Sequence, residues 1–312
     1  MKLSVVICAY NEEKFISHLL RKVSHPKLPP EITDYEVIVV ASGCTDETVP
    51  IVRNLMKKSR RIKLIEEEER RGKASALNKG LKVSSGDCIA IVSADVLPAD
   101  DGLYNLIVPF RDSETVAVSG RPVQNPLFQS GGLSGYLARV TYRIWGRLMK
   151  RLNDAGLAAH CSGEFMALRA NVLKRIPESC VADDAYIAVV ARRKGVIRYK
   201  PNAIGYNVMP SNLRDYVNQR RRWLYGHFQT RKLAGTYPTV MDTLVFLKPT
   251  FVLKVLAEEI RENPSEVHLL FAATLVEAII YVLTMFDRLQ NPQYAIWPVI
   301  KSTKMPLERQ GG

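Results

Sequence analysis

The chain has few cysteines and none of the short motifs that would mark a zinc, redox or P-loop protein. Its five cysteines are odd in number, lie far apart and include no C-x-x-C pair. This argues against a disulfide framework and leads us to expect free thiols in a reducing compartment. The bare Gly72-Lys73 pair lacks the spaced glycines and the following Ser or Thr of a phosphate-binding loop. The first residues also lack the basic region, full apolar stretch and cleavage site of a signal peptide, so we expect none to be removed.

Negative charge is under-represented. The 312 residues contain 44 Lys and Arg against 31 Asp and Glu, a formal net charge of +13. Such a surplus favours a polyanionic partner, which would be nucleic acid, anionic lipid or a phosphorylated substrate. The basic residues gather at 139–151, 192–200 and 214–232, close to amphipathic or apolar stretches. Because neither zinc-finger spacing nor an RNA-binding signature of the RRM type accompanies them, we expect no nucleic-acid partner.

Apolar segments alternate with helical patterns in the first hundred residues. The predicted strands are 3–9, 35–41, 62–65 and 88–92, with helices at about 15–23, 45–58 and 74–83 between them, and further strands at 116–119 and 165–168. Buried strands alternating with helices predict an α/β fold with a mostly parallel sheet covered on both faces. Ligands of such sheets lie beyond the carboxyl ends of the strands. Tyr10-Asn11, Ser42-Gly43 and Ser93-Ala94-Asp95 are all predicted to lie there.

Two later segments favour a membrane. Residues 133–148 place apolar side chains at helical spacing and arginines on another face, a pattern typical of an interfacial helix, with a soluble surface helix as the alternative. Residues 267–286 are largely apolar and long enough to cross a bilayer core of roughly 30 Å, provided that Glu277 faces protein or water. The alternative is a buried helix of a second soluble subdomain. The apolar run 244–257 is interrupted at Lys248 and predicts an interfacial or broken helix.

We therefore expect two regions. Residues 1–235 would form the catalytic domain and residues 236–312 a membrane-associated helical region. Lys and Arg occur on both sides of the long apolar segment, so charge bias alone does not set its topology. We expect the catalytic domain to stay cytoplasmic, because nothing before it in this sequence would drive export.

Acidic residues occur at two places that suit chemistry. Asp95 follows a predicted strand, where its carboxylate suits Mg²⁺ or Mn²⁺; the alternative is a turn or cap residue before Pro98. The pair Asp183-Asp184 either begins a helix and interacts with its dipole, or supplies a general base whose pKa the neighbouring carboxylate raises. Taken alone, the pair favours the capping role.

The third feature is Gln219-Arg220-Arg221-Arg222-Trp223. An arginine can hold diphosphate oxygens in a bidentate fork, and an aromatic ring can stack on the apolar face of a sugar. The alternative is a basic helix face whose side chains reach the membrane surface, a role that would suit Arg220 and Arg221. Placed between Asp95 and this segment, the Asp183-Asp184 pair favours a catalytic role.

This ordered set resembles the family 2 glycosyltransferases, in particular their membrane-embedded, cellulose-synthase-like branch, and the matches run from about Leu3 to Gly226. The resemblance implies a GT-A fold and a nucleotide diphosphate sugar as donor. It also implies roles for individual residues. They are Asp184 as general base, Asp95 as the ligand of Mg²⁺ or Mn²⁺, Tyr10, Asn11, Glu12, Lys73 and Arg222 on the donor side, and Gly163, Glu164, Gln219 and Trp223 on the acceptor side.

The sequence departs from the family pattern twice. The usual Asp-x-Asp reads Ser93-Ala94-Asp95, which leaves Asp95 as the main metal ligand. The usual Asp-Asp-Gly-Ser after the second strand reads Ala41-Ser42-Gly43-Cys44, so the acid that reads the base is absent or replaced, and uracil and guanine both stay open. Asp46 most simply caps the following helix.

The resulting hypothesis is an inverting, metal-dependent hexosyltransferase acting at the membrane on a lipid-linked glycan or polysaccharide. Resemblance to compact archaeal-type members favours mannose from GDP-mannose. The alternatives are a sugar-phosphate nucleotidyltransferase, for which residues 9–12 lack the glycine-rich loop, and a catalytically inactive membrane-surface module of the same fold. The hypothesis requires Asp95, Asp184 and Arg222 to meet around one pocket.

Overall fold

The computed structural model describes the chain except for residues 129, 158–159, 291–293, 297 and 305–312. Its strands are β1 (Lys2–Ala9), β2 (Asp34–Ser42), β3 (Ile62–Glu67), β4 (Cys88–Ser93), β5 (Leu97–Pro98), β6 (Thr115–Gln124), β7 (Phe165–Arg169) and β8 (Val196–Asn207). Within the described residues they form one sheet in the order β3-β2-β1-β4-β7-β6-β8-β5. The pairs among β1 to β4 are parallel, and β7 runs antiparallel to both of its neighbours. The predicted mostly parallel α/β sheet is confirmed.

Helices cover both faces of this sheet. The α-helices are α1 (Ile16–Val23), α2 (Thr48–Met56), α3 (Lys73–Val83), α4 (Gly102–Ile107), α5 (Gly132–Asp154), α6 (Asp183–Arg192), α7 (Leu213–Ala234), α8 (Met241–Leu247), α9 (Pro249–Glu262) and α10 (Val267–Gln290). The 3₁₀ turns are η1 (Val108–Arg111), η2 (Pro126–Phe128), η3 (Pro264–Glu266) and η4 (Lys301–Thr303).

Side-chain alternation along β1 explains the two covered faces. Leu3, Val5 and Ile7 point to one face and pack with α1, whereas Val6 points to the other and packs with Leu77 of α3. All four strand side chains are fully buried, as a strand with helices on both sides requires. Because successive side chains alternate between the two faces, β1 contributes to two separate hydrophobic cores.

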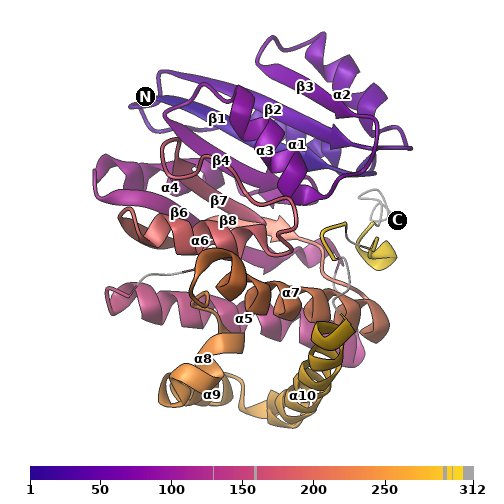
Figure 1. Cartoon of the computed structure of the whole chain (residues 1–312), viewed down its shortest axis with the longest axis vertical. Coiled ribbons are helices and arrows are strands. Elements are labelled where there is room, and N and C mark those ends of the chain that lie inside the picture. The colour runs from indigo at the N-terminus through magenta and orange to yellow at the C-terminus, as the bar shows by residue number, and fades with distance from the viewer. Residues whose placement is uncertain (129, 158–159, 291–293, 297, 305–312) are drawn as a thin grey trace.

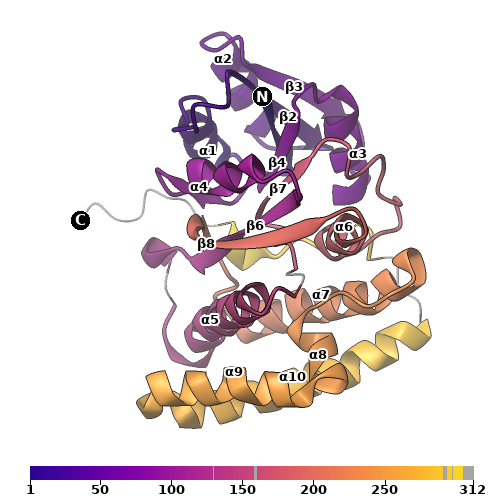
Figure 2. The ribbon, with the colours of Figure 1, turned by 90° about the vertical axis from the view of Figure 1, so that its left-hand side faces the viewer.

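The second half of the chain adds two layers of helices. Helices α5 and α7 lie below the sheet, and α8, α9 and α10 form the outermost layer on the side away from it (Figures 1 and 2). The broken helix expected over residues 244–257 is confirmed: α8 ends at Leu247, and Pro249 begins α9, the helix position that suits a proline.

The basic face of α5 differs from the lipid-facing position that its pattern favoured. Arg143 and Arg147 approach the Glu259 carboxylate of α9 to 2.6 Å and 3.0 Å, and Arg151 forms an ion pair with Glu258. Because these guanidinium groups form ion pairs with carboxylates of α9, the arginine face of α5 contacts protein. The amphipathic pattern of α5 therefore reflects its contact with α9.

All five cysteines are free thiols, and three of them are buried. Asp46 also behaves as expected, since its Oδ1 accepts a hydrogen bond of 3.0 Å from the Thr48 N–H at the start of α2. These two local predictions are confirmed.

Candidate active site

The three residues required to meet do so. Asp95, Asp184 and Arg222 all line one cavity of about 360 Å³. A smaller cavity of about 180 Å³ adjoins it on the side of β1 and β2. Both cavities are lined in part by the same five side chains, which therefore form the boundary between them: Lys73, Ser93, Asp95, Gln219 and Arg222.

The loop after β1 forms one wall of the smaller cavity. The Tyr10 ring stacks on the Arg70 guanidinium, whose central carbon lies 3.9 Å from the ring centroid. Glu12 is also in the wall and forms an ion pair with Lys304. Burial raises the pKa of Glu12 to about 8, and the charge of Asp95 adds to this effect. The expected donor-side residues Tyr10 and Glu12 thus contribute an aromatic ring stacked on Arg70 and a buried carboxyl group.

Asn11 has a different position from its neighbours. It lies outside the residues that line either cavity. Its side chain exchanges two hydrogen bonds with Thr45, one of 2.8 Å from the Thr45 N–H and one of 3.1 Å to the Thr45 hydroxyl. The backbone of Asn11 is left-handed, with φ of 52°. The residue therefore joins the loops after β1 and β2 and acts on the cavity indirectly.

Lys73 begins α3 directly after Gly72, whose φ of 89° suits glycine. Its Nζ lies 3.1 Å from Asp183 Oδ2 and 3.0 Å from the Gly163 carbonyl oxygen. Burial works to lower the pKa of Lys73, but the charges of Asp183 and Asp184 outweigh it and raise the pKa. Lys73 is therefore a largely buried cation, with 18% of its side chain exposed, at the junction of the two cavities.

The segment around Gly163 holds the acidic pair in place. The Gly163 N–H donates a hydrogen bond of 3.2 Å to Asp184 Oδ2, and the Gly163 carbonyl accepts one of 3.1 Å from the Ser93 hydroxyl. A Cβ on Gly163 would lie 3.0 Å from Asp184 Oδ2 and 3.2 Å from its carboxyl carbon. A side chain at this position would press on Asp184, whose carboxyl group would have to shift by a few tenths of an ångström.

Glu164, the next residue, is partly buried against the same segment. The Ser162 hydroxyl donates a hydrogen bond of 2.5 Å to its Oε2, and the Tyr142 hydroxyl donates one of 3.4 Å to its Oε1. Burial raises the pKa of Glu164. The expected acceptor-side residues Gly163 and Glu164 both line the larger cavity.

The two acids of the pair respond oppositely to their surroundings. Burial raises the pKa of Asp183, against the opposing effect of Lys73. For Asp184, burial also acts to raise the pKa, but His160, His227 and Lys73 outweigh it and lower it. The expectation that a neighbouring carboxylate raises the pKa of the general base is corrected for Asp184. That carboxyl group is held ionised, as a hydrogen-bond acceptor for a hydroxyl must be.

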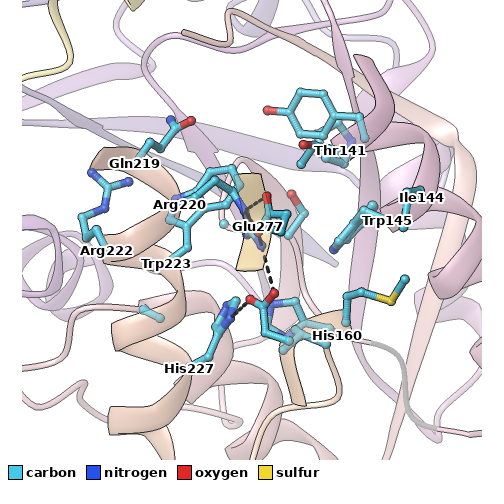
Figure 3. A pocket seen from close by; sticks show the side chains of 18 of the residues that line it. Thr141, Ile144, Trp145, His160, Gln219, Arg220, Arg222, Trp223, His227 and Glu277 are labelled. Carbon is cyan, nitrogen blue, oxygen red and sulfur yellow. Dashed lines mark hydrogen bonds and ion pairs between the residues drawn. The ribbon is translucent and has the colours of Figure 1, made fainter. Parts of the chain in front are cut away.

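The other expected residues lie on α7, and Figure 3 shows several of their side chains. Gln219, Arg222 and Trp223 line the larger cavity. Burial lowers the pKa of Arg222 to about 10, against the charges of Asp183 and Asp184, so the guanidinium remains protonated at neutral pH. Arg222 is thus a second buried cation facing the acids.

Arg220 and Arg221 tie α7 to the outer helices. Arg220 forms ion pairs of 2.9 Å with Asp242 and 3.0 Å with Glu277 (Figure 3). Arg221 forms one of 2.5 Å with Asp287. These two arginines were assigned to a membrane-facing role from the sequence, whereas their guanidinium groups contact carboxylates of α8 and α10.

One feature of the site was absent from the sequence prediction. His160 is 3% exposed, and its Nε2 lies 3.6 Å from Asp184 Oδ2. Its ring meets that of His227 edge-on, with centroids 6.0 Å apart, and His227 Nδ1 lies 2.7 Å from Asp242 Oδ2. The only available signal was the position of His160 directly before the Cys161-to-Phe165 segment.

The residue expected to hold a metal ion is a single carboxylate, Asp95. Asp95 lines both cavities. Among the described residues, no group of three or more His, Cys, Asp or Glu side chains is arranged to hold a metal ion. Mg²⁺ and Mn²⁺ fit such a position, because they need few carboxylates when substrate phosphates and water complete the ligand set.

This arrangement defines a class of protein. A parallel sheet presents acids, a buried lysine and a buried arginine beyond its carboxyl edge, around two joined cavities, and such an edge is where nucleotides bind. The class is an α/β transferase of the GT-A type, with two joined cavities that share Asp95, Lys73 and Arg222 in their walls.

Comparisons with known proteins name the family. The family described as "Glycosyl transferase family 2" matches residues 4–177, and "Glycosyl transferase family group 2" matches residues 128–297. The chain belongs to glycosyl transferase family 2. The GT-A fold and the family predicted from the motifs are confirmed.

Individual relatives are more distant. The chain is 26% identical over 245 residues to a poly-beta-1,6-N-acetyl-D-glucosamine synthase of Staphylococcus epidermidis, a match covering 76% of this chain and 57% of that protein. The synthase of the same name from Staphylococcus aureus is 25% identical over 258 residues, covering 80% and 60%. The chain thus spans less than two thirds of the length of these relatives.

Two solved structures share the fold. The mannosyltransferase PcManGT of Pyrobaculum calidifontis, in complex with GDP-Man and Mn²⁺, superposes with a TM-score of 0.66 at 24% identity, covering 93% of this chain and 87% of that one. Glucosyl-3-phosphoglycerate synthase of Mycobacterium tuberculosis, with Mn²⁺ and UDP, gives 0.51 at 18% identity, covering 75% and 80%. At these identities the likeness concerns the fold alone.

Proposed function

We propose that the protein is an inverting, metal-dependent hexosyltransferase that uses a nucleotide diphosphate sugar. The observation that carries this proposal is the meeting of Asp95, Asp184 and Arg222 around one cavity. The donor nucleotide occupies the smaller cavity, beside the Tyr10–Arg70 stack. The acceptor occupies the larger one, and the sugar lies at the boundary that the two cavities share.

The reaction follows from the positions of these groups. Asp184, held ionised, accepts the proton of an acceptor hydroxyl as that oxygen attacks the anomeric carbon. The bond from this carbon to the diphosphate oxygen breaks on the opposite side, and the nucleoside diphosphate leaves with the bonding pair. A single displacement inverts the anomeric configuration, so an α-linked donor yields a β-linked product.

Positive charge is needed where the leaving group forms. Lys73 and Arg222 line both cavities and face the diphosphate position, where fixed charges stabilise the developing anion. Asp95 is the residue that would hold Mg²⁺ or Mn²⁺, and the ion would supply further neutralisation of the diphosphate.

We propose mannose from GDP-mannose as the donor. A neighbour of the same fold, PcManGT, is described as a mannosyltransferase in complex with GDP-Man and Mn²⁺, which supports this choice. The relatives named as N-acetylglucosamine polymer synthases support the alternative of a UDP-linked sugar. Where the family has two acids after the second strand, this chain has Ala41 and Ser42, so the acid that reads the base is absent or replaced; Ser42 lines the smaller cavity.

For the acceptor we propose a glycan carried on a lipid. Below the carboxylates, the larger cavity continues between α5, α7, α8 and α10, where its walls are mainly apolar and aromatic, including Trp145, Trp223 and Tyr281. Aromatic walls suit the apolar faces of sugar rings. We also propose that residues 236–312 place this region at a membrane, with residues 1–235 as the catalytic domain on its cytoplasmic side.

A donor panel tests the proposal. Membranes from an expressing host are incubated with Mn²⁺ and GDP-mannose, UDP-glucose or UDP-N-acetylglucosamine, and release of each nucleoside diphosphate is measured against membranes carrying Asp184→Asn. We expect GDP-mannose to be consumed and the variant to be nearly inactive. Binding of neither GDP nor UDP by calorimetry with Mn²⁺ would instead identify an inactive module. Release of pyrophosphate from GTP or UTP in a separate incubation with a sugar 1-phosphate would identify a nucleotidyltransferase.

A further inference from the structure

Helix α10 has the length and composition of a membrane span but is attached to the catalytic domain along its side. It is the one helix among the described residues that is long and apolar enough to cross a bilayer. Its buried positions include Leu270, Ala273 and Ile280, which pack with Leu137 of α5 and Tyr216 of α7 in a shared core. One flank of α10 is therefore protein interior.

Three polar contacts hold this flank from end to end. Just before the helix, Glu266 accepts a hydrogen bond of 2.6 Å from Arg143 of α5. In the middle, Glu277 receives hydrogen bonds of 2.8 Å from the Tyr216 hydroxyl and 3.0 Å from Arg220. Near the end, Asp287 pairs with Arg221.

The spacing of these contacts decides the orientation. At about 1.5 Å per residue, the distance from Glu266 to Asp287 is about 31 Å, roughly the thickness of a bilayer core. A spanning α10 would have to pull α7 into the core with it or break these contacts, which would leave Glu277 unpaired in hydrocarbon. Since α7 carries Gln219 and Arg222 into the candidate active site, neither arrangement is compatible with this fold.

The opposite flank of α10 is an apolar stripe. Phe271, Leu275, Ile279, Val282 and Phe286 are between 51% and 67% exposed, and their spacing of three or four residues puts them on one face. The adjoining helices α8 and α9 continue the surface, and in Figure 2 α9 and α10 together form the layer farthest from the sheet. The further exposed apolar side chains are Phe246, Leu247, Leu253 and Ile260.

The charges on this outer layer indicate what covers it. Lys248, Lys254 and Arg261 are exposed and form no ion pair with any described residue. The acids of α9 point the other way: Glu258 and Glu259 form ion pairs with the arginines of α5. The layer therefore presents apolar and basic groups together, which is the combination that binds anionic lipid headgroups and the upper acyl region.

We propose that α8, α9 and α10 lie in the plane of one membrane leaflet, with the apolar stripe of α10 inserted at the headgroup boundary, and that α10 does not cross the bilayer. The sequence alone favours a span for the same residues. The contacts of Glu266, Glu277 and Asp287 favour the in-plane position. This inference is independent of the transfer chemistry and does not require the proposed donor or acceptor.

Binding is tested with the full chain and two kinds of lipid vesicle. We expect co-sedimentation with vesicles of phosphatidylcholine and phosphatidylglycerol, and weaker binding to phosphatidylcholine alone. The double variant Leu275→Gln/Ile279→Gln should weaken binding by about tenfold or more. Val83→Gln, at a 44% exposed position on α3, is the matched control and should bind as the parent does. Equal binding by the double variant would overturn the proposal.

Orientation is tested by labelling the two ends of α10. Ser265→Cys and Gln290→Cys are reconstituted separately into sealed vesicles and treated with a membrane-impermeant maleimide, with labelling of the parent as background. We expect equal labelling of both sites from the same side before detergent is added. Protection of one end until the vesicles are dissolved would establish a span. If the chain binds no vesicles and instead forms a dimer that the double variant dissociates, the surface is an interface between two copies.

Discussion

Replacing Lys73 by methionine should affect both the stability and the activity of the protein. Its ammonium lies 3.1 Å from Asp183, whose side chain is 3% exposed. Removing the cation leaves a carboxylate buried in its place, and breaking such a pair typically costs about 3–5 kcal/mol. We expect Lys73→Met to lose this amount of unfolding free energy. Lys82→Met, an exposed change on the same helix, should stay within about 0.5 kcal/mol of the parent.

The loss should depend on pH in a definite direction. Burial already raises the pKa of Asp183 against the effect of Lys73, and without the lysine it should rise further. A group whose pKa is higher in the folded state than in the unfolded state favours folding below the unfolded value of about 3.9, and this contribution disappears as pH rises through the folded value. The deficit of Lys73→Met should therefore be larger at pH 8 than at pH 5, as measured by urea unfolding.

A second substitution separates folding from function. Asp183→Asn removes the buried charge, so the double variant Lys73→Met/Asp183→Asn should recover most of the lost stability. Transfer activity should not recover, because the cation that faces the diphosphate is still missing. If Lys73→Met is as stable as Lys82→Met, or if Asp183→Asn restores no stability, the description of a buried ion pair at this junction is wrong.

Further outcomes are expected at the same site. Asp184→Asn should lower kcat by about 10²–10⁴-fold in a transfer assay while leaving nucleotide affinity unchanged; near-normal transfer by the folded variant would remove Asp184 as the base. Gly163→Ala should cost about tenfold in kcat because its Cβ presses on Asp184, whereas Gly131→Ala, with open space around its Cβ, should match the parent. Chelation of divalent cations should weaken nucleotide diphosphate binding at least tenfold by calorimetry, and unchanged affinity would contradict the metal assignment to Asp95.

The strands closest to the site were predictable because buried strands consist of short, nearly continuous runs of apolar residues. β1, β2 and β4 are short apolar runs, and the structure extends the predicted limits of each by only one or two residues. By contrast, β8 (Val196–Asn207) was not predicted. It mixes buried residues with Arg198, Lys200 and Pro201, and its pairing with β6 has irregular register. Its position depends on its neighbours in the sheet and not on its own pattern.

The candidate site likewise contains residues that the sequence predicted and contacts that it did not. Asp95 follows β4 and Asp184 lies in the first turn of α6, whereas Arg222 lies in the middle of α7. Their meeting was predicted from the resemblance of the ordered motifs to a known family, because local pattern alone does not bring Arg222 to the other two. The pairing of Lys73 with Asp183 joins residues 110 positions apart, and no local pattern records it. The arginines of α5 and α7 gave a misleading signal, since a basic helix face looks the same whether lipid or a carboxylate covers it.

Charge balance explains why both a cation and a buried arginine belong in this site. The larger cavity is lined by six acids and only three Lys or Arg side chains, and one of the three, Arg220, is held by Asp242 and Glu277. A nucleotide diphosphate would bring more negative charge into this surplus. Lys73 is shared with Asp183, so under the proposed function Arg222 and a divalent ion at Asp95 would add to the compensation that Lys73 supplies. The buried guanidinium, with a pKa of about 10, keeps its charge at neutral pH, which a donor-binding role requires.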